Sequence, residues 1–353
     1  MKRSVRECYQ SEGYVFAKNA AEIGKKHGIE RVARLASNEN PDPLSEVALK
    51  LGYEALSHAN RYPDERQSSL NEALIAVHGN YPFVTGVGMD GVIETTIRTL
   101  VEPGDLVAIS TPTFSFYRLS AIAQGAGVVE VLRGPGFTVE PDPFIEACEE
   151  VKLAFLCTPN NPTGNGTSVE VIREILEHIG CVLFLDNAYV EFSDLDYLPL
   201  LREYDNLIIG RTFSKAYSLA GLRVGYAFVP EWFRPYYLRA ATPHTLNAVS
   251  AAAAVGALSD IHHVDTARAR VQRLRKELSV RLNYPVMPSD ANFIMVDVAP
   301  LTSDEAVERL ARMGVLVRSC RSFRGLEDHY VRVSIGADWE NKMCIDAFSR
   351  LNP

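Results

Sequence analysis

Short apolar runs alternate with helical patterns between about residues 67 and 230. The segment 170–180 shows the helical pattern, because Ile172, Ile175 and Ile179 recur on one face. Strands that alternate with helices predict a mostly parallel sheet with both faces covered. The candidate strands are residues 105–110, 127–132, 152–158, 181–186, 206–212 and 224–229.

The pattern changes after about residue 245, which predicts a second, smaller α+β domain. An Ala-rich helix and a long charged helix come first, followed by two short strand patterns with a helix between them and a terminal helix. The first 33 or so residues show no strand of their own, and we expect them to pack on this second domain. The predicted division is a large domain at 34–245 and a small domain built from 1–33 and 246–353.

Charge and composition narrow the class of protein. The 353 residues carry a net charge of -8, which argues against a nucleic-acid-binding surface, although a pocket for a small anion can still be locally basic. No apolar run approaches the 18 residues of a membrane span, and the N-terminus lacks a signal-like apolar stretch. The six cysteines show no metal-ligand spacing, so we expect buried thiols, no metal site and a cytoplasmic protein.

Ligands of α/β sheets bind beyond the carboxyl ends of strands, so polar residues that follow the candidate strands are the candidates for chemistry. In RTFSKAYSLAGLRVGY (211–226), Lys215 directly follows a strand pattern. A lysine amine forms a Schiff base with an aldehyde cofactor when burial or a nearby cation lowers its pKa. Ser214 and Arg223 supply a hydroxyl and a charged fork that suit a phosphate. A lone lysine at a strand end is more often a solvated loop residue.

Two more strand ends carry polar residues. Asp186 and Tyr189 follow the apolar run of CVLFLDNAYVEF, where a carboxylate is costly unless it meets a cation such as a protonated pyridine nitrogen. The competing interpretation makes Asp186 a helix N-cap. Asn161, in CTPNNPTGN (157–165), precedes a proline and can hydrogen-bond a cofactor oxygen, but the same composition is typical of any turn.

The segment GVGMDGVIETTIRTLVEPGD (86–105) has glycines that open a helix. Backbone N–H groups at a helix start bind anions. The glycines lack the dinucleotide-binding context, and such a loop is often only a structural turn. Phe114 follows the strand 105–110 and can stack on an aromatic ring.

Taken in this order, the clusters resemble the fold-type I enzymes that depend on pyridoxal 5'-phosphate (PLP), and among them the histidinol-phosphate aminotransferase family. The resemblance extends from ARLASNENP (33–41) and RYPDERQSSLNEAL (61–74) to YVRVSIG (330–336). CTPNNPTGN, LDNAYVEF and RTFSKAYSLAGLR are specific as a set. The resemblance implies a large domain with a mostly parallel sheet, a small α+β domain and aminotransferase activity.

The resemblance assigns a role to each candidate residue. Lys215 forms the Schiff base and moves the proton, Asp186 pairs with the pyridine nitrogen, and Tyr62 reaches the phosphate of the neighbouring subunit in a homodimer with shared active sites. The other implied cofactor contacts are Asn161 and Tyr189 at the ring oxygen, Phe114 on the ring face, and Met89, Asp90, Ser214 and Arg223 at the phosphate.

Substrate choice is implied by fewer residues. Arg332 matches the arginine that binds the substrate carboxylate or its equivalent, Arg318 matches an arginine near a substrate phosphate, and Tyr14 matches a tyrosine of the N-terminal arm. Two arginines suit a doubly charged group. The implied reaction converts histidinol phosphate and 2-oxoglutarate to imidazole acetol phosphate and glutamate in histidine biosynthesis.

Several alternatives remain open at this point. The segment 317–333 also resembles threonine-phosphate decarboxylases of cobalamin synthesis, and an aromatic-amino-acid aminotransferase would need no substrate phosphate. Arg318 also suits the exposed face of a strand whose core face holds Val315 and Val317. A non-catalytic binding module is disfavoured, because such proteins usually lose the lysine or the aspartate.

Overall fold

The computed structural model describes residues 4–11 and 13–351, and its largest element is a seven-stranded sheet. The strand order is β2-β8-β7-β6-β5-β3-β4, and only β8 runs antiparallel to its neighbours. The α/β class is therefore confirmed. The strands are β2 (Phe83–Val87), β3 (Leu106–Thr111), β4 (Gly127–Leu132), β5 (Leu153–Cys157), β6 (Val182–Asp186), β7 (Leu207–Thr212) and β8 (Val224–Phe228).

Six of these strands were predicted, with their ends displaced by one residue at most, and β2 was missed. The centre of the sheet is buried on both faces, so its strands are continuous apolar runs such as LAFLC and VLFLD. The run FVTGV is weaker, because it is short and contains a glycine, which strands disfavour.

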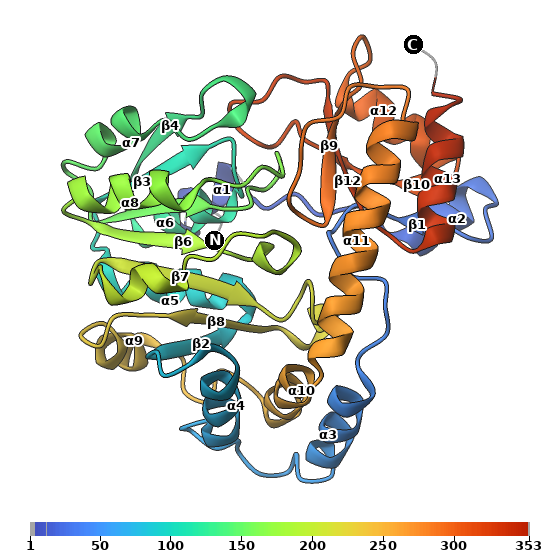
Figure 1. Ribbon diagram of the computed structural model, residues 1–353. Helices are drawn as coiled ribbons and strands as arrows, with labels where there is room; N and C mark the ends of the chain where they lie inside the picture. Colours follow the sequence, from blue (N-terminus) through green and yellow to red (C-terminus); the bar gives the residue numbers. More distant parts are fainter. Residues whose placement is uncertain (1–3, 12, 352–353) are drawn as a thin grey trace.

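Helices cover both faces of the sheet (Figure 1). Helix α5 packs on β2, β7 and β8 and contacts α6 and α9, whereas α7 and α8 pack against each other. The pattern predicted at 170–180 is α8, with Ile172, Ile175 and Leu176 buried. The bounds are α5 (Gly88–Leu100), α6 (Phe116–Gln124), α7 (Pro141–Ala147), α8 (Val169–His178) and α9 (Arg234–Ala240), with 3-10 turns η2 (Pro135–Phe137), η3 (Val190–Phe192), η4 (Leu198–Arg202) and η5 (Ala220–Leu222).

The small α+β part contains a three-stranded antiparallel sheet of order β11-β12-β9 and a two-stranded parallel pair β1-β10. These sheets and helices agree with the α+β class that the sequence predicts after about residue 245. The elements are β1 (Ala33–Arg34), β9 (Phe293–Asp297), α12 (Ser303–Arg312), β10 (Val315–Leu316), β11 (Arg318–Ser319), β12 (Tyr330–Ser334) and α13 (Asp338–Phe348).

The N-terminal segment departs in part from expectation. Helix α2 (Ala20–His27) contacts α12 of the small part, but α1 (Cys8–Ser11) contacts α6 on the large sheet. Ala33 also belongs to strand β1, so the segment is not free of strand. A two-residue strand is too short to show an alternating pattern, and the sequence has no signal for which surface a short terminal helix contacts.

One long helix, α11 (Ile261–Arg281), connects the two parts (Figure 1). Helix α10 (Ala248–Ser259) packs on α3 (Glu46–Leu56) and α4 (Ser68–His78), and α11 runs from there alongside the small part. Gly256 lets α10 approach closely, because a Cβ there would lie 2.7 Å from the Ala48 Cα. The boundary near residue 245 stays a prediction. Among the described residues no helix is long and apolar enough to cross a membrane.

Candidate active site

A cavity of about 260 Å³ opens beyond the carboxyl ends of β5, β6 and β7. The large sheet contributes one wall, and the small part contributes the other through β11 and β12. Every site residue predicted from the sequence lines this cavity except Tyr62. These residues are Tyr14, Met89, Asp90, Phe114, Asn161, Asp186, Tyr189, Ser214, Lys215, Arg223, Arg318 and Arg332.

Lys215 follows β7 in a tight loop that turns its side chain into the cavity. The loop is closed by Leu219, whose N–H donates to the Phe213 carbonyl at 3.0 Å, and Ser218 takes a left-handed φ of 59°. The Lys215 Nζ donates to the Ser37 carbonyl at 3.2 Å. Burial, and then the charge of Arg332, lowers the pKa of the Lys215 amine to about 8. A larger neutral fraction makes this amine a better nucleophile and base.

Asp186 ends β6 at the base of the cavity, with only 3% of its surface exposed. Its two oxygens accept hydrogen bonds from the Tyr117 hydroxyl at 2.6 Å and the Ala188 N–H at 2.9 Å. No lysine or arginine of the described chain forms an ion pair with it, and burial raises the pKa of the carboxyl group to about 6. A buried carboxylate without a cation partner fits the protonated ring nitrogen of PLP.

Asn161 and Tyr189 line the cavity and are held by residues of other segments. The Tyr189 hydroxyl accepts a hydrogen bond from the Asn38 amide at 3.1 Å. The Asn161 side-chain oxygen accepts from the Arg332 guanidinium, so its amide nitrogen remains available as a donor to a ring oxygen. The same guanidinium also donates to the Ala36 carbonyl at 2.7 Å.

The start of α5 forms a cradle with Ser214 and Arg223. Arg223 donates to the Asp90 carboxylate at 2.7 Å and to the Ser214 hydroxyl at 3.4 Å. The first N–H groups of a helix have no partner within it, so Met89 and Asp90 present backbone donors there. Gly88 has a φ of 68°, and a Cβ at that position would collide with the Arg223 guanidinium. The glycine therefore keeps the cradle open.

Arg318, Tyr14 and Phe114 line the outer end of the cavity. The Arg318 guanidinium carbon lies 5.8 Å from the centre of the Tyr14 ring, and Tyr14 meets Phe114 edge to face at 6.0 Å. Only 8% of Arg318 is exposed, so its interpretation as a solvated strand residue is wrong. Burial, followed by the repulsion of Arg332, lowers the pKa of Arg318.

Tyr62 lies outside this cavity. It is 82% exposed and stacks on His244 with ring centres 4.4 Å apart. Sequence reasoning also missed two residues that support the cavity, Asn38 and Tyr117. Asn38 lies within the motif ARLASNENP and Tyr117 lies three residues after Phe114, and these positions are the signals that could have identified them. No group of three or more metal-ligating side chains occurs within residues 4–11 and 13–351.

Comparisons with known proteins agree with this geometry. The family model "Aminotransferase class I and II" matches residues 30–351. A histidinol-phosphate aminotransferase of Methanoculleus marisnigri is 58% identical over 99% of this chain and 100% of its own length. The crystal structure of the Sinorhizobium meliloti histidinol-phosphate aminotransferase in complex with PLP has a TM-score of 0.88 at 24% identity, covering 99% of this chain and 98% of that chain.

The fold alone does not separate transamination from decarboxylation. The L-threonine-O-3-phosphate decarboxylase of Porphyromonas gingivalis has a TM-score of 0.78 at 22% identity, with 90% of this chain and 98% of that chain covered. The family match and the full-length identity decide the assignment instead. The chain belongs to the aminotransferase class I and II family of PLP-dependent enzymes, and within it to the histidinol-phosphate aminotransferases.

Proposed function

We propose that this enzyme transfers the amino group of histidinol phosphate to 2-oxoglutarate, giving imidazole acetol phosphate and glutamate, a step of histidine biosynthesis. The observation that carries the substrate assignment is the pair Arg318 and Arg332 in one cavity with Lys215. Neither arginine forms an ion pair with any described carboxylate. Two buried guanidinium groups without a counterion favour a ligand with a doubly charged anionic group.

The proposed roles of the residues follow from their positions. PLP, when bound, supplies an electron sink that stabilises negative charge at the substrate α-carbon. Lys215 would take the proton from this carbon and move it onward, as a base with a pKa near 8 can do at neutral pH. Asp186 keeps the ring nitrogen protonated, and Tyr189 and Asn161 orient the ring through its oxygen. Phe114 stacks on the ring face.

The phosphate of the cofactor is assigned to the cradle at the start of α5. Arg223 and Ser214 are the side-chain donors, and Met89 and Asp90 contribute backbone N–H groups. At the outer end, Arg318 and Tyr14 face the substrate phosphate and side chain. Arg332 binds the carboxylate of glutamate and the equivalent polar group of the amino alcohol.

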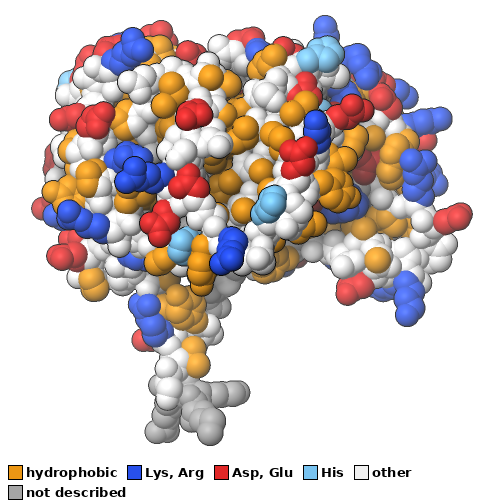
Figure 2. Space-filling model, turned by 90° about the horizontal axis from the view of Figure 1, so that it is seen from below, with side chains coloured by type: hydrophobic (Ala, Val, Ile, Leu, Met, Phe, Trp, Pro, Cys, Tyr) orange, Lys and Arg blue, Asp and Glu red, His pale blue; other side chains and the backbone are white. Residues whose placement is uncertain are grey.

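We also propose a homodimer in which Tyr62 completes the partner's site. Tyr62 has a large exposed ring and lies outside its own cavity. The lower face of the molecule, where α3 and α4 lie, carries hydrophobic side chains among charged ones (Figure 2). Exposed apolar residues on these helices are Val47, Leu49, Tyr53, Leu56, Ile75 and Val77. Such a surface suits a second copy of the chain.

The proposed compartment is the cytoplasm. All six cysteines are free thiols, and five of them are buried. Unpaired thiols are typical of proteins that work in a reducing compartment.

Steady-state kinetics test the substrate assignment directly. Histidinol phosphate should be the preferred amino substrate over phenylalanine and threonine phosphate, with an absolute requirement for 2-oxoglutarate. Release of carbon dioxide from threonine phosphate without any keto acid would instead support the decarboxylase. Equal efficiency with phenylalanine would support the aromatic-amino-acid aminotransferase.

A further inference from the structure

Residues 36–42 form a linking segment that contacts catalytic groups of both parts. The Ala36 carbonyl accepts from Arg332 of β12 at 2.7 Å, and the Ser37 carbonyl accepts from the Lys215 Nζ at 3.2 Å. The segment therefore touches the lysine on one side and the carboxylate-binding arginine on the other. The position of the linking segment therefore decides how Lys215 and Arg332 are placed relative to one another.

Asn40 connects this segment to the backbone of the lysine loop. Its amide nitrogen donates to the carbonyl of Ala216, the residue after Lys215, at 3.2 Å. Its side-chain oxygen accepts from the Arg270 guanidinium at 2.8 Å. Through these two hydrogen bonds Asn40 connects Arg270 to the backbone of the loop that carries Lys215.

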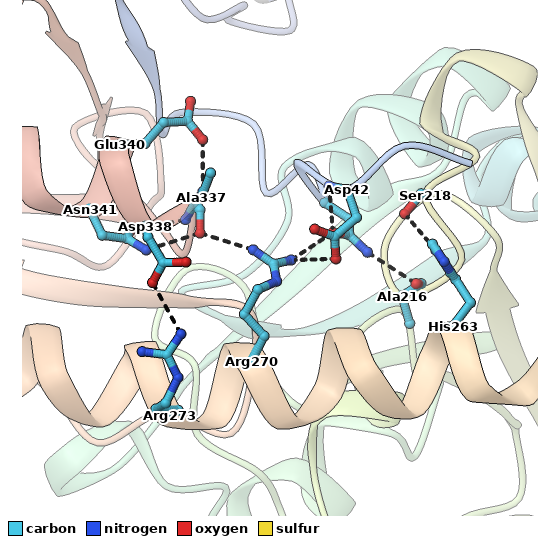
Figure 3. A network of polar contacts seen from close by, with 12 residues as sticks. Asp42, Ala216, Ser218, His263, Arg270, Arg273, Ala337, Asp338, Glu340 and Asn341 are labelled. Carbon is cyan, nitrogen blue, oxygen red and sulfur yellow. Dashed lines mark hydrogen bonds and ion pairs between the residues drawn. The ribbon is translucent and has the colours of Figure 1, made fainter. Parts of the chain in front are cut away.

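Arg270 projects from α11 into the junction between the two parts (Figure 3). Its side chain is 14% exposed, and it pairs with the Asp42 carboxylate at 3.0 Å. Its other terminal nitrogen donates to the carbonyl of Gly336 at 3.1 Å. Gly336 lies two residues beyond β12, the strand that carries Arg332. One planar guanidinium therefore joins the linking segment to the small part, a geometry that lysine cannot reproduce.

Helix α11 contacts the lysine loop a second time. His263 lies seven residues before Arg270, which is about two helical turns on the same face. Its Nε2 forms a hydrogen bond of 3.2 Å with the hydroxyl of Ser218, at the end of the loop. The helix is thereby connected to the loop at both Ala216 and Ser218 (Figure 3).

We propose that Arg270 is a positioning residue that, through Asn40, fixes the Lys215 loop relative to Arg332. Arg270 does not line the cavity. Its effect on catalysis rests on the proposed role of Lys215 in proton transfer. Loss of Arg270 should leave the lysine loop less ordered and slow proton transfer, while the cofactor still binds.

The test compares Arg270→Met with Arg273→Met in the full-length holoenzyme. Arg273 is a matched control, because it lies on the same helix and pairs with Asp338 at 3.1 Å, but its side chain is 59% exposed. Amide hydrogen exchange of residues 213–219 should be about fivefold faster in Arg270→Met, since each lost hydrogen bond weakens local closure. The amides of Ser218 and Leu219 report this directly, because both donate within the loop. Arg273→Met should exchange as the wild type does.

Kinetics provide the second measurement. Arg270→Met should lower kcat by about 10- to 100-fold with little change in KM, as expected for a misplaced catalytic group. The deuterium isotope effect on kcat with α-deuterated glutamate should rise, because proton transfer becomes rate-limiting. A simple loss of folded enzyme would lower kcat without changing the isotope effect. Asn40→Ala should show the same loss of kcat and the same rise in the isotope effect. The double variant of Arg270→Met and Asn40→Ala should lose no more kcat than Arg270→Met alone.

Unchanged exchange at 213–219 in Arg270→Met, or an unchanged isotope effect, would overturn the proposal. If Arg270→Met does not fold, Arg270→Lys keeps the charge and should give the same two changes to a smaller degree. Failure of the proposed function is seen separately, as absent turnover of histidinol phosphate. The exchange measurement and the glutamate half-reaction still decide the role of Arg270 in that case.

Discussion

Arg318 and Arg332 are register partners on the antiparallel strands β11 and β12 and line the same cavity. Side chains directly opposite in such a pair lie about 5 Å apart, and like charges there repel. Neither guanidinium is neutralised by a described carboxylate, and the Arg332 charge contributes to the lowered pKa of both Arg318 and Lys215. Two neighbouring cations without a counterion favour the binding of an anion in this site.

Arg318→Ala therefore tests the phosphate assignment. Each charge-assisted hydrogen bond is worth about 1.5–3 kcal/mol, so the loss should be roughly 10- to 150-fold in kcat/KM toward histidinol phosphate. The glutamate half-reaction, whose carboxylate we assign to Arg332, should change little. Arg321→Ala is the control, because Arg321 lies nearby but pairs with Asp304 at the surface. Equal losses on both substrates would remove the phosphate role.

Lys215→Ala should retain cofactor without a covalent bond and lose turnover by several orders of magnitude, since it removes both nucleophile and proton carrier. In the wild type, borohydride reduction followed by peptide mapping should place the cofactor on Lys215. Lys276, which does not line the cavity, offers a control for general effects of removing a lysine. A label on any other lysine would refute the assignment.

Much of the fold could be predicted, because buried strands can be recognised in the sequence as apolar runs. Six strands of the large sheet were identified in this way, and each predicted cofactor residue after a strand end does line the cavity. For the small part the sequence predicted the α+β class but not every strand, because β1, β10 and β11 have two residues each. Such strands exist through tertiary pairing and leave no periodic signal.

The parts of the site that the sequence did not reveal depend on contacts between distant segments. Tyr117 lies on the inward face of α6, where an aromatic residue is typical of core, and only the fold brings it to Asp186. Asn38 reaches Tyr189 from a segment without a strand. Arg318 alternates with Val315 and Val317, which suggested an exposed face, but that face lines the cavity and Arg318 is buried there.

Tyr62→Phe tests the shared site. The variant should lose cofactor more readily on dialysis, because the hydroxyl no longer reaches a phosphate. Mixed dimers with Lys215→Ala should recover tight cofactor binding at one site, since the Lys215→Ala subunit supplies an intact Tyr62 to its partner. Tyr53→Phe, another exposed tyrosine, is the control. A monomer with full activity would contradict the homodimer.

Asp186→Asn gives a prediction that depends on pH. Burial raises the pKa of Asp186 to about 6 in the protein without cofactor, against about 3.9 in an unfolded chain. A raised carboxyl pKa means that the stabilising contribution of the protonated group is fully present below about pH 3.9 and is lost as the pH rises through 6. Ionisation of Asp186 should therefore lower the free energy of unfolding by about 3 kcal/mol at pH 8 and by about half of that at pH 5.

The cofactor-free Asp186→Asn variant should accordingly unfold at a higher Tm than the wild type at pH 8, and by a smaller margin at pH 5. Bound cofactor should reverse the order, because a neutral amide cannot pair with a pyridinium while the carboxylate can. Thermal unfolding with and without cofactor at both pH values measures this directly. The same variant should slow proton abstraction severely. Activity within about tenfold of the wild type would mean that another residue holds the ring nitrogen, since loss of a buried charge pair costs more than that.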